Sequence, residues 1–307
     1  MIRAGVADNQ DTMSLPPCQP MLLEPVQPHA TFLVFDLVPG HDPRAAIQRL
    51  REVAADRPSV IGFGAPLAFA LGAEIPELRA FPAMVGPGVA FPSTQGALWA
   101  YLPGTDRSVV IDHALSLREA LGAGFRLDEE VSAFKYRTGL DLTGFEDGTE
   151  NPKDEAAVAA AIVSGKGPGL DGSSFVAAQK FRHDLERFRA LRPEDQDQVI
   201  GRERATNEEM AGAPVSAHVK RTAQESFEPA AFMLRRSMPW GGAGEQGLYF
   251  VAFGESLDRY ERVLARMTGR EDGVVDALLG FTRALSGGYY WCPPLADGRL
   301  DLSRLGL

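Results

Sequence analysis

A glycine-flanked polar segment, Gly144 to Pro152 (GFEDGTENP), is the densest group of residues in the sequence that could do chemistry. Its glycines permit backbone conformations that other residues resist, so such a loop can place an acid for proton transfer. The same composition is also typical of a turn that joins two domains. A third interpretation, the phosphoryl-transfer loop Asp-x-Asp-Gly-Thr, is disfavoured because Phe145 occupies the position of the nucleophilic aspartate.

Histidines are the second candidates, and they are scarce. The chain has five: His29, His41, His113, His183 and His218. They show no HxxxH or HExxH spacing, and the two cysteines form no CxxC pair, so a zinc site with several His or Cys ligands is hard to assemble. Haem asks the protein for as little as one axial ligand, and a single histidine is enough for it. Any one histidine taken alone is more often a surface or core residue than a ligand.

Two further segments follow the polar loop in a characteristic order. His218 lies in Ser216 to Thr222 (SAHVKRT), and Leu234 to Pro239 (LRRSMP) comes after it. With the GxxDG pattern that begins at Gly144, and with Pro293 directly after the last expected strand, these segments resemble the dye-decolourising peroxidases. The similarity runs from about Pro20 to the end of the chain. The lack of large insertions resembles the compact bacterial B-type branch.

The resemblance implies a cofactor and a set of site residues. The cofactor is haem b (iron protoporphyrin IX), with His218 as the iron ligand. On the opposite, distal side the family pattern implies three residues: Asp147 as the acid, Arg235 as the cation and Ser237 as a further polar group. Asp276 is implied as the hydrogen-bond partner of His218, Arg202 as the partner of a haem propionate, and Gly148 and Thr149 as cofactor-binding residues of the signature loop. Solvent-facing roles remain open for Asp276 and Arg202. The neighbouring Arg236 is the competing candidate for the distal cation. Arg235 is chosen because it precedes Arg-Ser-Met-Pro by the offset of the family pattern, and the alternative for Arg236 is an exposed residue or a structural ion pair.

The distal residue types suit peroxide cleavage. One peroxide oxygen must lose a proton and the leaving oxygen must gain one, and a carboxylate that carries this proton is typically worth about 10² to 10⁴-fold in rate. Negative charge grows on the leaving oxygen, and a permanently charged guanidinium aimed at it lowers the barrier. Asp147 and Arg235 supply these two groups.

The activity that the resemblance implies is reduction of H₂O₂ to water with one-electron oxidation of organic donors such as phenols and aromatic dyes. An alternative is a haem-binding or haem-handling protein whose peroxidase activity is incidental. Such a carrier needs His218 but has little use for Asp147 and Arg235. A cofactor-free α+β binding module is the third hypothesis.

Regular elements that could position these residues recur in the same order in both halves. Expected strands cover 31–38, 60–63, 96–102, 130–136, 174–181, 247–253 and 288–292, and expected helices cover 46–54, 109–121, 183–191 and a segment capped by Ser256. The pattern predicts an α+β fold of two ferredoxin-like domains: a duplicated split βαβ unit with antiparallel sheets and helices packed on them. We expect an extended or flexible arm over 1–29, an N-terminal domain over 30–143, a connecting loop with the GxxDG motif over 144–172, and a haem-binding C-terminal domain over 173–307.

Composition narrows the partners. The 307 residues carry 31 Lys and Arg against 41 Asp and Glu, a net charge of −10 without a basic block, which argues against nucleic acid. No apolar run is long enough for a membrane span, and Asp8 and Asp11 interrupt the region where a secretory peptide needs apolar residues. Cys18 and Cys292 fit a reducing compartment. The sequence therefore predicts a cytoplasmic protein, and the resemblance adds a homo-oligomer.

Overall fold

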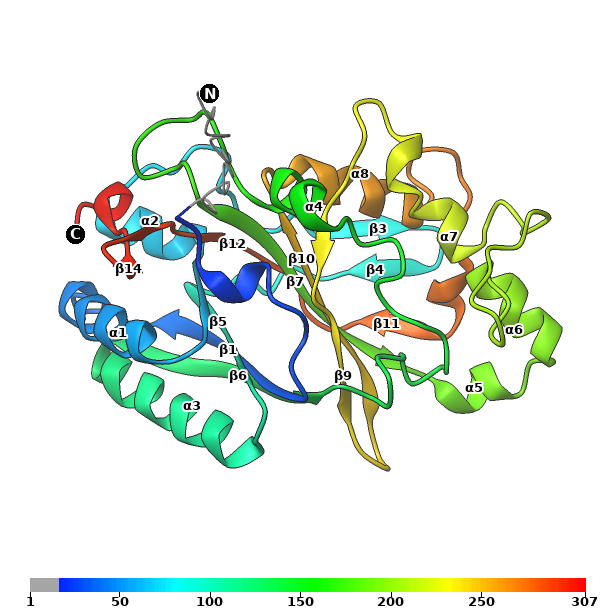
Figure 1. The fold of residues 1–307 in the computed structure, drawn as a ribbon, viewed down its shortest axis with the longest axis horizontal. Coiled ribbons are helices and arrows are strands. Elements are labelled where there is room, and N and C mark those ends of the chain that lie inside the picture. Colours follow the sequence, from blue (N-terminus) through cyan, green and yellow to red (C-terminus); the bar gives the residue numbers. More distant parts are fainter. Residues whose placement is uncertain (1–16) are drawn as a thin grey trace, which may run out of the picture.

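The computed structural model describes residues 17–307, a mixed α/β fold in which helices cover antiparallel strands (Figure 1). The elements of the first half are β1 (His29–Leu37), α1 (Arg44–Asp56), β2 (Val60–Phe63), α2 (Ala65–Leu71), β3 (Met84–Gly86), β4 (Val89–Phe91), β5 (Leu98–Gly104), α3 (Arg107–Leu121) and β6 (Phe125–Phe134). Those of the second half are α4 (Asp154–Ala161), β7 (Ser174–His183), α5 (Leu185–Arg189), α6 (Pro193–Ile200), α7 (His218–Arg221), β8 (Leu234–Arg235), β9 (Met238–Gly241), β10 (Gln246–Gly254), α8 (Asp258–Met267), β11 (Thr282–Ala284), β12 (Gly288–Cys292), β13 (Leu295–Ala296) and β14 (Arg299–Leu300).

Strands of both halves form one sheet in the order β11-β7-β12-β2-β5-β1-β6-β9-β10-β8, and β7 also pairs with β10. This last pairing closes a ring of strands at the centre of the molecule. The halves meet in the ring at single residue pairs, Phe63 with Trp291 and Ala133 with Trp240. A closed ring has no free edge there, so β7 and β10, which line the site, have fixed neighbours on both sides.

Side chains alternate across this ring, as the period of two in a strand requires. One set forms a cluster in which the Phe32 and Tyr249 rings stack at 4.1 Å and the Trp99 indole donates a hydrogen bond to the Tyr249 hydroxyl at 3.2 Å. The other set packs beneath the helices, and each fully buried large side chain contributes about 1.5 to 3 kcal/mol. On β7 and β10 this outer face carries the residues that line the candidate site.

The expected strands 31–38, 60–63, 96–102, 174–181, 247–253 and 288–292 are confirmed to within a few residues, and the strand expected at 130–136 begins earlier, at Phe125. Four corrections concern the rest. The segment 144–172 holds helix α4, and the helix expected over 183–191 is only Leu185–Arg189. Leu257 takes the N-cap position of α8 in place of Ser256. The unexpected elements are the helices α2, α6 and α7 and the strands β3, β4, β8, β9, β11, β13 and β14. The four-part division of the chain stays a prediction.

The expected N-terminal arm is described only from residue 17. Residues 17–28, which we call the strap, are fixed to the body: the Gln19 amide donates to the carbonyl groups of Ile61 and Pro293, and the Lys135 amide donates to the Pro28 carbonyl. This part of the arm is therefore held in place rather than flexible. The remainder of the expected arm, and Asp8 and Asp11 with it, lie outside the described residues. Within residues 17–307, no helix combines the length and apolar character that a membrane span needs.

Candidate active site

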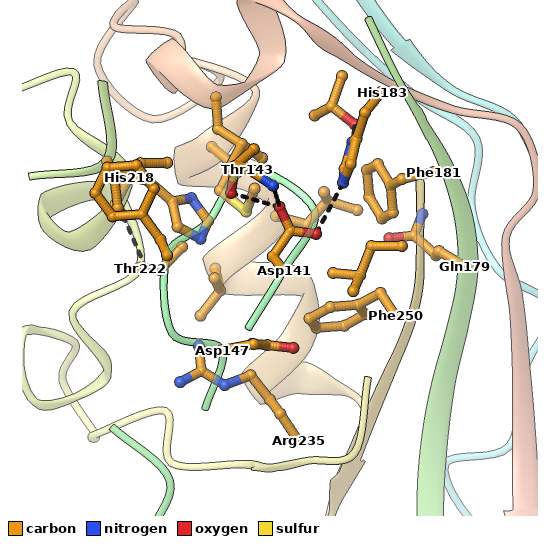
Figure 2. A pocket seen from close by; sticks show the side chains of 18 of the residues that line it. Asp141, Thr143, Asp147, Gln179, Phe181, His183, His218, Thr222, Arg235 and Phe250 are labelled. Carbon is orange, nitrogen blue, oxygen red and sulfur yellow. Dashed lines mark hydrogen bonds and ion pairs between the residues drawn. The ribbon is translucent and has the colours of Figure 1, made fainter. Parts of the chain in front are cut away.

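A cavity with about 1040 Å³ of space between atoms, counted out to its opening, lies between β7, β10, α8 and the loop that follows β6 (Figure 2). Its walls are mostly apolar and include Phe145, Phe181, Ile200, Met233, Leu248, Phe250, Val263, Leu264, Met267, Leu278 and Phe281. A small number of polar side chains reach it from separate elements. Apolar walls with a few converging polar groups are typical of a site for a cofactor or small molecule.

His218 enters the cavity as the first residue of α7. Its Nδ1 lies 2.7 Å from Oδ2 of Asp276, whose side chain is fully buried, and the other oxygen of Asp276 accepts a hydrogen bond from the Leu278 amide at 2.9 Å. An ionised carboxylate can only accept, so Nδ1 carries the proton. In its neutral form the imidazole then presents an unprotonated Nε2, which is the form that binds a metal.

Asp147 points into the same cavity and lies next to Arg235 (Figure 2). The side chain of Asp147 is exposed to the open space of the cavity, but protein atoms surround that space. Partial loss of solvation raises the pKa of Asp147 above its usual range, while the nearby Arg235 guanidinium opposes the increase. The carboxyl group is thus prepared to hold a proton more readily than a surface aspartate.

Arg235 belongs to the short strand β8, and Asn151 fixes its backbone. The side-chain oxygen of Asn151 accepts from the Arg235 amide at 2.8 Å, and the Asn151 side-chain nitrogen donates to the Arg235 carbonyl at 3.0 Å. Gly148 makes room for this amide: its φ is +78°, and a Cβ there would lie 2.8 Å from the Asn151 nitrogen. The polar loop therefore carries Asp147 and also sets the position of Arg235.

Two buried donors on residues of the cavity wall lack a partner within residues 17–307. They are Nε of Arg235 and the side-chain nitrogen of Gln179. Buried polar groups in folded proteins are nearly always hydrogen-bonded. Two such donors are therefore unusual, and both belong to residues that form the wall of this cavity.

Comparisons with known proteins agree on one family. The family model described as "Dyp-type peroxidase, C-terminal" matches residues 138–297. The dye-decolorizing peroxidase of Rhodococcus erythropolis is 33% identical over 301 residues, which cover 92% of this chain and 88% of that protein. This chain belongs to the Dyp-type peroxidase family.

Solved structures of Dyp-type peroxidases have the same fold. DyPB from Rhodococcus jostii RHA1 superposes with a TM-score of 0.81 at 28% identity, covering 89% of this chain and 94% of that chain. A dye-decolorizing protein from V. cholerae gives 0.82 at 26% identity, covering 95% and 99%. A DypB variant from Rhodococcus jostii was solved in complex with heme. Such peroxidases are built from ferredoxin-like domains, as the strand and helix order predicts for this chain.

A second polar group of this Dyp-type peroxidase was missed from sequence. His183, at the end of β7, places Nδ1 2.7 Å from the Thr282 hydroxyl and Nε2 3.2 Å from Asp141. Asp141 also accepts from the amide of Thr143 at 2.9 Å and from its hydroxyl at 2.5 Å. Burial alone raises the pKa of Asp141, but these hydrogen bonds outweigh burial and lower it. Only the position of Asp141, just ahead of the polar loop, hinted at the pair.

The pair has a mechanical and an electrostatic effect on the site. It ties the loop that bears Asp147 to β7 and β11, and the negative charge of Asp141 adds to the increase in the pKa of Asp147. Both ring nitrogens of His183 are engaged. Of the two histidines in the cavity, His218 is therefore the one with a nitrogen available to a metal.

The remaining predicted residues lie beside the cavity rather than in its wall. Ser237 accepts from the Val251 amide at 3.3 Å and lines an adjoining cavity, together with Gly148. The buried Arg202 donates to the Asn207 carbonyl at 2.8 Å and forms an ion pair with Glu150. The Thr149 hydroxyl accepts from the Asn207 amide at 2.9 Å. Of the eight predicted site residues, the structure brings His218, Asp147 and Arg235 to the cavity wall, with Asp276 directly behind His218.

Proposed function

We propose that this chain is a haem b peroxidase that reduces H₂O₂ to water while it oxidises phenols, aromatic dyes or similar organic donors by one electron at a time. Membership of the Dyp-type peroxidases supports the peroxidase activity. The observation that carries the residue assignment is the arrangement in one cavity of His218, backed by Asp276, with Asp147 and Arg235.

The residues present fit haem. A planar, largely apolar cofactor suits the apolar walls of the cavity, and the Nε2 atom of His218 is a suitable ligand for its iron. His218 would hold the iron through Nε2, so it is both the metal ligand and the main cofactor-binding residue. When bound, haem supplies an iron centre that takes electrons from organic donors and passes them to peroxide.

Asp276 keeps the imidazole of His218 in one tautomer and one orientation. A hydrogen bond from Nδ1–H to a buried carboxylate makes Nε2 a stronger electron donor. Such a ligand favours the oxidised metal, and therefore peroxide reduction over reversible binding of oxygen. Asp276 thus acts through His218.

Asp147 and Arg235 handle the peroxide. Asp147 in its ionised form accepts a proton from one peroxide oxygen and returns it to the leaving oxygen, which departs as water. Its raised pKa makes the carboxyl group a better acceptor for this proton than a solvated aspartate. The guanidinium of Arg235, held through Asn151, stabilises the negative charge that grows on the leaving oxygen.

The peripheral residues keep their predicted roles as proposals. Ser237 would complete the distal polar group from the adjoining cavity, and Gly148 and Thr149 would support the loop at the cofactor. Arg202 would face a haem carboxylate, and Glu150 competes for the same guanidinium.

A comparison of absorption spectra tests the proposed function. Protein from cells supplied with a haem precursor should show a Soret band that shifts rapidly when H₂O₂ is added, and His218→Ala should abolish the native spectrum. The carrier alternative makes a different prediction for Arg235→Leu. A peroxidase with this replacement keeps its haem but reduces peroxide slower by about 10² to 10³-fold, whereas unchanged kinetics would favour a haem carrier.

A cytoplasmic homo-oligomer completes the proposal. The two cysteines are free and buried, which supports a reducing compartment. Three apolar side chains on α3, Val109, Ile111 and Leu115, are exposed on the isolated chain, and burial of this face between copies would remove them from water. Sedimentation equilibrium and cell fractionation test these two points.

A further inference from the structure

A second cavity adjoins the first on the side of Asp147 and Arg235. It holds about 1000 Å³ of space between atoms by the same measure. Asp147 and Arg235 line both cavities, so their side chains stand at the boundary between the two. A small molecule that enters the outer cavity therefore meets the two groups proposed to act on peroxide.

The strap forms part of the outer cavity. Pro25 and Val26 line it on one side, and Lys135 and Tyr136, which directly follow β6, line it on another. The second side is fixed by the backbone pairing of β6 with β1. The first side is a segment without helix or strand, so its position depends on what ties it down.

Hydrogen bonds from Arg236 hold this part of the strap in place. Its Nε donates to the Glu24 carbonyl at 2.7 Å and its Nη2 to the Leu23 carbonyl at 2.6 Å, while Nη1 donates to the Arg235 carbonyl at 3.1 Å. A planar guanidinium with donors in a fixed fork holds two successive carbonyl groups at set positions. The contacts link the strap just before Pro25 to the residue next to Arg235. The side-chain partners of Arg236 within residues 17–307 are backbone carbonyls, so Arg236 is neither fully exposed nor in an ion pair there.

We propose that Arg236 determines which peroxides this enzyme accepts. By holding the strap against β8, it fixes the wall that Pro25 and Val26 form in front of Asp147 and Arg235, so that H₂O₂ enters and bulky organic hydroperoxides are excluded. Arg236 also lines the outer cavity, but the role proposed here is that of a positioning residue, which acts through Pro25 and Val26. The inference rests on the proposed function in assuming that peroxide reacts at Asp147 and Arg235.

Other ties of the strap allow Arg236 to be tested alone. Gln19 is bound to Ile61 and Pro293, and the Pro28 carbonyl is bound to the Lys135 amide. Loss of Arg236 should therefore release the stretch around residues 23–27 while both ends stay attached. Arg236→Met keeps the apolar stem and removes every donor. Arg236→Lys keeps the charge and one point of donation, and should restore part of the effect.

Arg304 offers a matched control. Its guanidinium also donates to a backbone carbonyl, that of Pro168, at 3.1 and 2.9 Å, and neither residue lines either cavity. Arg304→Met removes the same kind of tie at a site remote from Asp147.

Two measurements on the full chain test the proposal. The first is amide hydrogen exchange of the strap, before and after haem loading, which does not depend on activity. Arg236→Met should accelerate exchange at residues 23–27, and Arg304→Met should not. The second is the rate constant for the haem-loaded protein with H₂O₂ and with cumene hydroperoxide, which is reduced to its alcohol and water by two electrons and two protons from the same donors.

We expect Arg236→Met to raise the cumene hydroperoxide rate relative to the H₂O₂ rate by about tenfold or more, the size of effect that a steric fit of this kind supplies. Arg236→Lys should fall between Arg236→Met and the unchanged chain. If Arg236→Met does not fold, the comparison of Arg236→Lys with the unchanged chain decides. Unchanged exchange of the strap would overturn the anchoring role, and faster exchange with an unchanged rate ratio would overturn the selectivity. A haem-loaded chain that fails to react with any peroxide would instead refute the proposed function, and the exchange result would stand apart from it.

Discussion

Replacement of Asp276 by asparagine should show whether His218 is an iron ligand whose properties Asp276 sets, or only a buried histidine. The carboxylate accepts from two donors, Nδ1–H of His218 at 2.7 Å and the Leu278 amide at 2.9 Å. Asparagine has nearly the same shape but only one acceptor oxygen. Its NH₂ group must therefore face one of these two donors, in a place where Asp276 is 1% exposed and water offers no substitute.

Either orientation of the new amide weakens the site. If its oxygen faces His218, the Leu278 amide loses its acceptor and a charge-assisted hydrogen bond becomes a neutral one, at a cost of about 1.5 to 3 kcal/mol. If its nitrogen faces His218, the imidazole must change tautomer, and Nε2 then carries the proton where the iron should bind. Loss of such a supporting carboxylate typically lowers metal affinity by about 10 to 100-fold.

The assay combines haem affinity with the reduction potential of the loaded protein. We expect affinity to fall within that range. If the loss of affinity falls mainly on ferric haem, which the carboxylate favours, the reduction potential of the bound iron should rise by about 60 to 120 mV. A tenfold change in the ratio of ferric to ferrous affinity corresponds to about 59 mV for one electron. Asp141→Asn is the matched control, because it disrupts the other buried Asp–His pair of the cavity without touching His218. An Asp276→Asn protein with the affinity and potential of the unchanged chain would refute the reasoning.

Three more predictions concern the loop, the acid and the core. Asp147→Asn should remove the low-pH decline of the peroxide rate, and it should leave the unloaded fold as stable or more stable above pH 4 in urea titrations. The raised pKa means that the folded state disfavours the charged form of Asp147, so the unfolding free energy of the unchanged chain declines as the pH rises through that pKa. A less stable Asp147→Asn protein would contradict this reasoning. Gly148→Ala should slow peroxide reduction and lower the unfolding free energy more than Gly165→Ala does. Both glycines have a positive φ, but only at Gly148 would the added methyl group contact Asn151. Equal effects of the two replacements would contradict this clash. His113→Leu should reduce the loss of stability at low pH, because burial lowers the pKa of this 2% exposed ring to about 4. The unfolded chain therefore binds more protons, and the unfolding free energy falls by roughly 3 kcal/mol as the pH falls from about 6.5 to 4. An unchanged dependence of stability on pH would refute the assignment.

The strands of the fold were predictable where the sequence runs are long and apolar. Buried runs such as those of β1, β7, β10 and β12 leave little alternative to a strand. The joining of the two halves into one ring was not predictable, because β2 meets β12 and β6 meets β9 at single residue pairs that leave no local signal. The helices α4 and α6 are short, and composition at that length does not separate a helix from a loop.

For the site, the order of the three sequence motifs was enough to identify residues that lie on short segments. Asp147, His218 and Arg235 reach one cavity although 88 residues separate the first from the last. The pair of His183 and Asp141 was missed because its partners are 42 residues apart and a single histidine looks the same whether it is structural or functional. The role of Asn151 was missed for another reason: its contacts with Arg235 run through the backbone, which no residue pattern records.

Diffraction from crystals of the haem-loaded chain tests the central claim most directly. The account predicts electron density for a flat macrocycle in the cavity, the iron bonded to Nε2 of His218, and the side chains of Asp147 and Arg235 on the opposite face. Iron bonded to His183, or Asp147 and His218 on the same face of the macrocycle, would contradict it.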